Sequence, residues 1–256
     1  MKIARYQSGN AIHYGRLEGD RLVRLGGSIW EGGTPTGDID PVDAVRLLCP
    51  VDAPRIFGVG LNYVAHIEES GAATPKQPLL FMKPSTSATG PDADVIYPRE
   101  GQNVHFEAEL AVIIGKAGRR VSLADSLSIV FGYTCANDIS ERVIQAQEMA
   151  IGALLIGKGY DGFCPLGPVI ETELDPTRLA IGARVNGQQK QASNTSDLLF
   201  SVADLVHYMT KAITLLPGDV IITGTPAGVG PVKPGDIVEI EIEGIGVLRN
   251  RIVAEA

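Results

Sequence analysis

One stretch of this chain, residues 105–115, constrains its fold more than any other. It places Glu107 and Glu109 two positions apart, directly before a continuous apolar run that ends at Ile114. Side chains two apart on a β-strand share a face, so the two carboxylates would lie side by side with His105 next to them. Like charges beside a core repel, and each costs several kcal/mol to desolvate. A divalent cation such as Mg²⁺, Mn²⁺ or Ca²⁺ would compensate, because hard cations take oxygen ligands.

A solvent-facing strand is the alternative interpretation, because many strands carry Glu-x-Glu on an exposed face. The same alternation recurs near the C-terminus, where Glu239, Glu241 and Glu243 alternate with apolar residues between two turns. For that second run we expect a solvated face. Periodicity alone does not separate the two runs, so other segments must decide.

Composition limits the class of protein. The chain has 256 residues, of which 45% are hydrophobic and 20% charged, which is typical of a globular protein with a sizeable core. A net charge of −8 argues against the basic face that nucleic acid requires. No apolar run is long enough to span a bilayer, and the first residues lack the apolar block of a signal peptide. We therefore expect a cytoplasmic protein with neither nucleic-acid nor membrane partners.

The spacing of the three cysteines does not indicate a functional site. Cys49, Cys135 and Cys164 are far apart and form no Cys-x-x-Cys, so they fit neither a zinc site nor a disulfide framework. Cys135 lies close to Asp138 and could be considered a nucleophile, but a small buried hydrophobe is the simpler interpretation.

Short alternating segments separated by turns predict a mixed, β-rich α+β fold. Residues 1–25 are typical of short strands with a hairpin turn at residues 17–22, and a loop or linker is expected over residues 32–38. We place a boundary near residue 50, which gives a small N-terminal β region at residues 1–50 and a larger domain at residues 51–256. Strands do not alternate strictly with helices, which argues against a doubly wound sheet.

Helix signals are few and short. Residues 61–71 predict a helix that ends at a glycine. Ser140 can cap a second helix that runs to about Ala150. Ser122 and Ser201 are each followed three residues later by an aspartate, the spacing of a capping box, so each should open a helix.

Two glycine-rich segments do not fit nucleotide-binding motifs. Tyr63 stands where a dinucleotide fingerprint that begins at Gly58 and Gly60 needs its third glycine. Residues 224–230 lack the Gly-Lys-Ser/Thr of a P-loop. Both nucleotide interpretations are excluded.

Six segments that follow one another over residues 55–250 together resemble the fumarylacetoacetate hydrolase family. No single segment is specific, but their order is. The segments are Gly60-Leu61-Asn62-Tyr63 with His66 and Glu69, Phe81-Met82-Lys83-Pro84, His105-Phe106-Glu107-Ala108-Glu109-Leu110, Gly132-Tyr133 through Asn137-Asp138, Gly157-Lys158-Gly159-Tyr160-Asp161-Gly162 through Pro168, and Thr223-Gly224-Thr225-Pro226 with Gly228-Val229-Gly230. The resemblance implies a β-roll of sheets with short flanking helices after a small N-terminal β region, and a homodimer.

The resemblance also implies a metal site. It assigns Glu107, Glu109 and Asp138 as ligands of Mg²⁺ or Mn²⁺, with positions left open for water and a bidentate substrate. Some distant members add a fourth acidic ligand upstream of the histidine. Val59 and its neighbours offer no acid here, so we expect three protein ligands.

Three further residues match catalytic positions of the family. His66 and Glu69 match its His-x-x-Glu dyad; three apart on a helix they can touch, and the carboxylate would make His66 basic enough to deprotonate water. Without the family context, a solvated surface pair is the alternative for these two. Lys158 matches a lysine that stabilises enolate or oxyanion charge.

Four residues match substrate-binding positions. The resemblance implies that Gln145 contacts substrate and that Thr225, in a glycine-rich turn, binds the substrate carboxylate. Arg142 is equally well explained as a brace for the loop of Asp138, and Lys83 as a structural residue.

The implied reaction is turnover of a 2-oxo acid through a metal-stabilised enolate. We expect carbon–carbon bond hydrolysis of an acylpyruvate-type substrate, because the complete dyad suits water activation. The alternatives are 5-carboxymethyl-2-hydroxymuconate isomerase and oxaloacetate-type decarboxylase. A non-catalytic metal-binding scaffold is disfavoured because both the dyad and Lys158 are present.

Overall fold

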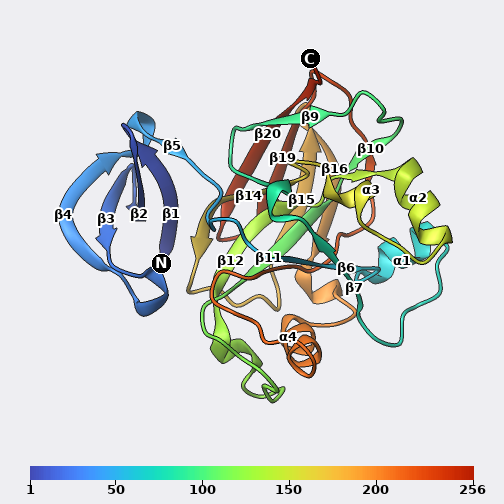
Figure 1. Ribbon diagram of the computed structural model, residues 1–256, viewed down its shortest axis with the longest axis horizontal. Helices are drawn as coiled ribbons and strands as arrows, with labels where there is room; N and C mark the ends of the chain where they lie inside the picture. Colours follow the sequence, from blue (N-terminus) through green and yellow to red (C-terminus); the bar gives the residue numbers. More distant parts are fainter.

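The computed structural model describes all 256 residues and contains many strands and few helices, as the sequence predicts. Figure 1 shows a small lobe that holds β1 to β4 and a larger body that holds most other strands, with α1, α2 and α3 on the side away from the lobe. The strands are β1 (Lys2–Ser8), β2 (Ala11–Glu18), β3 (Arg21–Gly26), β4 (Thr34–Pro41), β5 (Arg46–Leu47), β6 (Ile56–Gly60), β7 (Leu79–Lys83), β8 (Ala88–Thr89), β9 (Asp94–Tyr97), β10 (Val104–Phe106), β11 (Ala108–Ile114), β12 (Val130–Asn137), β13 (Ser140–Glu141), β14 (Cys164–Glu171), β15 (Ala180–Val185), β16 (Gln188–Asn194), β17 (Val220–Ile222), β18 (Gly230–Pro231), β19 (Ile237–Ile242) and β20 (Gly246–Ala254). The helices are α1 (Val64–Ser70), α2 (Arg142–Ala150), α3 (Ile156–Gly159) and α4 (Val202–Thr210).

The lobe is an antiparallel meander in the order β4-β3-β2-β1, with the expected hairpin between β2 and β3. It is not a separate sheet, because β1 also pairs with β14 through Lys2 opposite Glu171 and Ile3 opposite Ile170. One sheet therefore runs through both parts of the molecule. The division at residue 50 stays a prediction.

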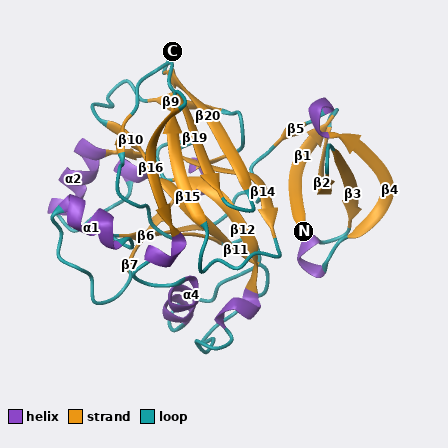
Figure 2. Cartoon of the chain, turned by 180° about the vertical axis from the view of Figure 1, so that it is seen from behind, coloured by secondary structure: helices purple, strands orange, loops and turns teal.

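The body contains two large layers of strands. The long sheet continues from the lobe in the order β14-β12-β11-β17-β6-β7, and a second sheet has the order β16-β15-β19-β20-β9. The second sheet lies against the first through contacts of β15 and β19 with β11 and of β20 with β14 (Figure 2). Strand β11 lies at the centre, and all seven of its residues are buried. A strand whose two faces are both covered by protein is buried along its whole length.

The predicted strand over residues 105–115 is interrupted at Glu107. Its N–H donates to Asn137 Oδ1, and its carbonyl accepts from the N–H of Asp138, so these contacts replace the sheet ladder at this position. As a consequence β10 belongs to a small sheet with β13 and β18, whereas β11 begins one residue after Glu107. The expectation of one continuous strand from His105 through Glu109 is therefore not met, since His105 lies on β10 and Glu109 on β11.

Two helix ends agree with the sequence. Helix α1 ends at Gly71, which adopts φ 65° and caps the last turn, and α4 begins with a complete capping box between Ser201 and Asp204. Ser122 opens only a turn and a short 3₁₀ segment over Ser126–Ile129.

The N-cap of α2 is Glu141 rather than Ser140. The Ser140 hydroxyl donates to the Asp138 carbonyl oxygen, so it does not reach the helix N-terminus. The Glu141 carboxylate instead accepts from the N–H groups of Ile144, Gln102 and Asn103. The start of α2 is thereby held against the chain segment that leads into β10.

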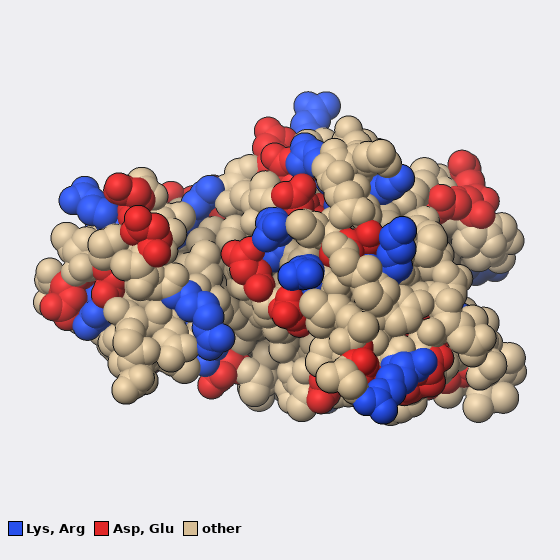
Figure 3. All heavy atoms as spheres, turned by 90° about the horizontal axis from the view of Figure 1, so that it is seen from above, with Lys and Arg blue, Asp and Glu red and all other residues tan.

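No helix in the structure combines the length and apolar character needed to cross a bilayer. Figure 3 shows one face of the molecule, on which acidic and basic side chains are interspersed rather than gathered into a continuous basic surface.

Candidate active site

Three buried carboxylates meet where β11 and β12 run side by side. Oxygens of Glu107, Glu109 and Asp138 all lie within 4.8 Å of one another. The residues are 4%, 1% and 0% exposed, respectively. The register places Ala108 opposite Asn137, and Asp138 follows Asn137 at the end of β12, so the strand pairing itself brings Asp138 beside the two glutamates. We call these three residues the acidic cluster.

Basic side chains contact two members of the acidic cluster. Lys158 Nζ lies 2.7 Å from Glu107 Oε2 and 2.5 Å from Asp138 Oδ2. Lys83 Nζ lies 2.5 Å from Asp138 Oδ1, and Arg142 lies 2.5 Å from Glu107 Oε1. Burial opposes ionisation of Glu107, but Lys158 and Arg142 more than offset it, so the pKa of Glu107 lies well below its usual value. Burial likewise opposes the charge of Lys158, yet Asp138 and Glu107 raise its pKa.

Glu109 differs from the other two acids because no basic group contacts it. Its Oε2 accepts a hydrogen bond of 2.7 Å from the N–H of Gly224. Burial, followed by the charges of Asp138 and Glu107, raises the pKa of Glu109 well above its usual value. A carboxylate in this position ionises readily only beside a further cation. Three converging oxygen donors of this kind fit a hard divalent ion such as Mg²⁺ or Mn²⁺.

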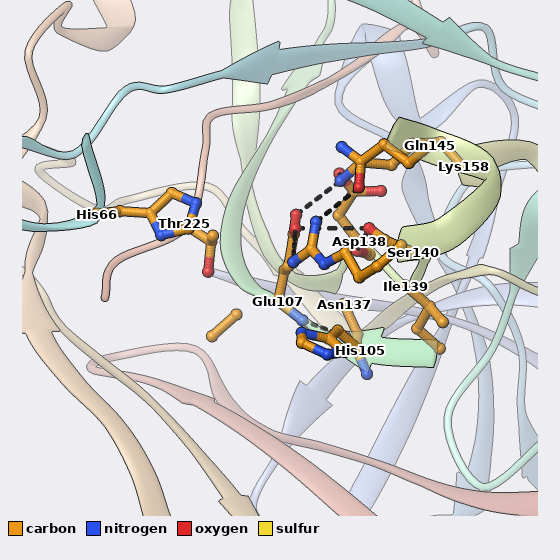
Figure 4. Close-up of polar contacts among 12 residues, drawn as sticks. His66, His105, Glu107, Asn137, Asp138, Ile139, Ser140, Gln145, Lys158 and Thr225 are labelled. Carbon is orange, nitrogen blue, oxygen red and sulfur yellow. Dashed lines mark hydrogen bonds and ion pairs between the residues drawn. The ribbon is translucent and has the colours of Figure 1, made fainter. Parts of the chain in front are cut away.

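The predicted dyad forms at the rim of the site. His66 Nδ1 lies 3.0 Å from Glu69 Oε2, and Glu69 Oε1 accepts from the N–H of Gly228. Glu69 thus ties helix α1 to the loop that carries Thr225. In the view of Figure 4, His66 and Thr225 lie together on one side of the site, and Asp138, Gln145 and Lys158 lie on the other.

A cavity of about 90 Å³ joins the two sides. It is lined by eight of the ten predicted site residues: His66, Glu107, Glu109, Asp138, Arg142, Gln145, Lys158 and Thr225. Glu69 lies outside the lining, beside His66. Lys83 is fully buried and holds Asp138 together with the carbonyl oxygens of Ile139 and Phe163. Its contacts support the structural alternative for this lysine.

The side chain of Arg142 contacts Glu107 and Gln145, so both roles considered for it, as a substrate contact and as a brace for the loop of Asp138, stay predictions. It lines the cavity and pairs with Glu107, and its Nη1 donates to Gln145 Oε1 over 2.8 Å. That contact leaves the Gln145 amide nitrogen as the free end of the side chain.

Two residues that support the site were not predicted from the sequence. Glu148 accepts hydrogen bonds from the N–H groups of Leu155, Ile156 and Gly157, and so holds the turn of α3 that carries Lys158. Gln191 on β16 is fully buried and contacts both β11 and the Thr225 loop. Neither has a sequence signal, because Glu148 lies in a polar helix segment and Gln191 in the polar run Gln188-Gln189-Lys190-Gln191.

The cysteines take no part in the site. Burial raises the pKa of Cys135 to about 12 and that of Cys49 to about 11. Buried thiols that stay protonated are poor nucleophiles. The hydrophobic interpretation of Cys135 agrees with its position in the core.

Comparison with known families decides the relationship. The family described as "Fumarylacetoacetate (FAA) hydrolase C-terminal" matches residues 55–253, and "Rv2993c-like, N-terminal" matches residues 1–50. The chain belongs to the fumarylacetoacetate hydrolase family. The resemblance inferred from the ordered motifs is therefore confirmed.

Three relatives illustrate the range of activities in this family. The crystal structure of a 5-carboxymethyl-2-hydroxymuconate delta-isomerase from Mycobacterium smegmatis is similar to this chain, with 39% identity, a TM-score of 0.93 and full coverage of both chains. The human mitochondrial oxaloacetate tautomerase FAHD2A is 42% identical over 83% of this chain and 71% of its own length. A maleylpyruvate hydrolase from Sphingobium sp. SYK-6, solved with manganese(II) and pyruvate, is 32% identical with a TM-score of 0.82 over the full length of both chains. Members of the family are thus enzymes that include isomerases, hydrolases and tautomerases.

Proposed function

We propose that this protein is a divalent-metal-dependent hydrolase that cleaves a carbon–carbon bond in an acylpyruvate-type 2-oxo acid. One observation carries the proposal: His66, held by Glu69, lines the same small cavity as the acidic cluster. The arrangement places a candidate base for water next to candidate ligands for a Lewis acid.

Glu107, Glu109 and Asp138 would hold the metal ion, in agreement with their oxygen chemistry and with the absence of a basic partner at Glu109. When bound, Mg²⁺ or Mn²⁺ supplies Lewis-acid polarisation of the 2-oxo group. The manganese and pyruvate in the maleylpyruvate hydrolase relative support this assignment.

His66 acts as the general base. The Glu69 carboxylate can only accept a hydrogen bond, so the proton of a neutral His66 lies on Nδ1 and the lone pair on Nε2. That nitrogen takes a proton from water as the water attacks the acyl carbonyl. Glu69 stabilises the imidazolium that results, and its second oxygen, fixed by the Gly228 N–H, keeps the ring in place.

Lys158 and the substrate-binding residues stabilise negative charge on the substrate. Lys158 is buried at the floor of the cavity and stabilises the oxygen charge that develops on the pyruvyl fragment. The free amide nitrogen of Gln145 and the Thr225 hydroxyl bind carboxylate oxygens of the substrate. A cavity of about 90 Å³ lies far below the roughly 300–1,000 Å³ of larger ligand pockets, which favours a compact acid.

Proton transfer on the same type of substrate is the second candidate. It is favoured by the 42% identity to an oxaloacetate tautomerase and the 39% identity to a hydroxymuconate isomerase. In this case His66 would shuttle a proton between substrate atoms, and no water would be consumed.

The two candidates are separated by assays of the purified protein with Mn²⁺ on acetylpyruvate, on the enol form of oxaloacetate and on 5-carboxymethyl-2-hydroxymuconate. We expect release of pyruvate and acetate from acetylpyruvate, loss of this activity in Asp138→Asn, and a fall of about 10²–10⁴ in kcat for His66→Gln with unchanged Mn²⁺ affinity. Turnover of oxaloacetate enol or the muconate without any cleavage of acetylpyruvate would instead establish the second candidate. Equal loss of activity and Mn²⁺ affinity in His66→Gln would contradict the base role.

A further inference from the structure

Gln191 bridges the strand of the acidic cluster and the loop of Thr225. Its Oε1 accepts a hydrogen bond of 2.9 Å from the N–H of Ala108, the residue between Glu107 and Glu109. Its Nε2 donates to Thr225 Oγ1 over 2.8 Å and to the Pro226 carbonyl oxygen over 2.7 Å. The residue is completely buried, so water does not compete for these contacts.

These partners fix the orientation of the Gln191 amide. A backbone N–H such as that of Ala108 can only donate, and a carbonyl such as that of Pro226 can only accept. Rotation of the amide by half a turn would leave both of these buried groups facing the wrong end of the side chain. The amide nitrogen therefore faces Thr225 permanently.

This orientation determines what the Thr225 hydroxyl can do. A hydroxyl has one proton to donate, and Thr225 Oγ1 already accepts from Gln191. The structure offers that proton no acceptor within the protein, while Thr225 lines the cavity beside the acidic cluster. Its proton is thus available to an acceptor in the cavity.

The backbone around Gln191 leaves little freedom to change this arrangement. A Cβ on Gly228 would lie 2.3 Å from the Lys190 carbonyl oxygen, and a Cβ on Gly182 would lie 2.8 Å from that of Gln191. The Thr225 loop and strand β15 therefore press against β16 on both sides. Gln191 is held by its backbone as well as by its side chain.

We propose that Gln191 is a positioning residue that turns Thr225 into a dedicated hydrogen-bond donor for a carboxylate oxygen of the ligand. The proposal rests on the proposed function for the identity of that ligand, an anionic 2-oxo acid. It predicts that Gln191 affects binding of the acid and leaves the metal ligands and His66 unaffected.

The variant Gln191→Glu tests this role. A glutamate has the same shape and can still accept from the Ala108 N–H. Its second oxygen attracts the Thr225 proton away from the cavity and faces the Pro226 carbonyl oxygen without a proton to donate. In the Mn²⁺-loaded protein we expect the KM for acetylpyruvate and the dissociation constant of oxalate to rise about ten- to a hundredfold. The loss of oxalate affinity should exceed any change in kcat or in Mn²⁺ affinity, because only the contact with the acid depends on the Thr225 proton.

Gln189→Glu is the matched control. Gln189 is exposed on the same strand, so the variant Gln189→Glu introduces the same charge without contact to Thr225. It should leave the KM and oxalate binding unchanged. In a double-mutant cycle, Gln191→Glu should add little to the KM of Thr225→Val, because both substitutions remove the same donated proton.

Several outcomes decide the proposal. Unchanged KM and oxalate affinity in Gln191→Glu, or a full additive effect in the cycle, would overturn it. Equal losses of oxalate and Mn²⁺ affinity would also overturn it, because they would indicate a structural role. If Gln191→Glu does not fold, a crystal structure of the wild-type protein with Mn²⁺ and oxalate decides, since Thr225 Oγ1 must then lie within hydrogen-bond distance of oxalate while still accepting from Gln191.

The result also separates this inference from the proposed function. Oxalate binding that weakens in Gln191→Glu, in a protein that turns over no 2-oxo acid, would refute the hydrolase function alone. Turnover by the wild-type protein with an unaltered KM in Gln191→Glu would refute the role of Gln191 alone.

Discussion

Two regions of this molecule carry the same pattern of alternating glutamates and put it to opposite uses. Glu107 and Glu109, next to and within β11, are buried with Asp138 in the core of the body. Glu241 and Glu243, at the end of β19, are exposed to solvent. The difference lies in the neighbouring strands and not in the local sequence.

On β19 the acidic side chains do not meet other acids in a buried place. Arg184 on β15 lies 2.7 Å from Glu241, with 41% and 48% of the two side chains exposed. Exposed pairs of this kind contribute about 0–1 kcal/mol. At β11 the strand pairing brings a third acid beside two others in a buried place. There, like charges require cations, and the lysines and Arg142 reach only two of the three acids.

The largest expected effect of this difference is on metal binding. Glu109→Gln should weaken Mn²⁺ binding by at least about a hundredfold and abolish metal-dependent turnover, because loss of a ligand exceeds the 10–100-fold effect of supporting residues. The control Glu241→Gln removes the same charge from the exposed strand and should change neither quantity. Titration calorimetry measures the Mn²⁺ affinity of both variants. Equal Mn²⁺ affinities of Glu109→Gln and Glu241→Gln would contradict the difference proposed between the buried and the exposed glutamates.

Lys158 and Lys190 allow the same comparison between a buried and an exposed charge. Lys158→Met should lower kcat by about 10²–10³, the effect of losing one preorganised group that stabilises developing charge. It should also destabilise the metal-free protein by about 3–5 kcal/mol, because two buried carboxylates lose a partner. Lys190→Met, on the exposed part of β16, is the control for urea unfolding. A fully stable Lys158→Met protein would contradict the requirement of these two carboxylates for Lys158 as a partner.

A smaller effect concerns pH. The pKa of Glu109 is raised in the folded state, so the folded protein binds more protons than the unfolded chain above the ordinary glutamate pKa of about 4.5. Metal-free wild-type protein should therefore lose stability as pH rises from about 4.5, and Glu109→Gln should not suffer this loss. The difference in unfolding free energy between the two should grow by about 1.4 kcal/mol per pH unit until the folded-state pKa is reached. Urea unfolding in EDTA at several pH values measures it, and a constant difference would contradict the assignment.

The smallest effect is expected on the exposed strand. Arg184→Gln breaks the ion pair with Glu241 and should change the unfolding free energy by at most about 1 kcal/mol, with the effect disappearing at high salt. Thermal unfolding at low and high salt provides the measurement. A loss comparable to that of Lys158→Met would mean that burial does not distinguish the two regions.

The sequence predicts local features of the fold well, because their causes are local. The glycine that ends α1 and the capping box of α4 depend on residues within one turn of each other. The order of motifs also identified the family and hence the β-roll.

Features that depend on distant partners were not predictable from the sequence. The chain leaves the ladder at Glu107 because Asn137 and Asp138, on another strand, take its backbone hydrogen bonds. Glu148 and Gln191 support the site only because folding brings α3 and the Thr225 loop to them. Alternating charge cannot reveal which strand becomes central, so the burial of Glu109 and the exposure of Glu241 emerge only from the assembled sheets.

The most direct test of the metal assignment is an anomalous difference map from crystals of the wild-type protein grown with Mn²⁺. We expect one peak per chain, about 2.0–2.6 Å from oxygens of Glu107, Glu109 and Asp138. A map without a peak at these residues at saturating Mn²⁺, or with manganese bound only elsewhere on the chain, would contradict the assignment of the acidic cluster as the metal centre.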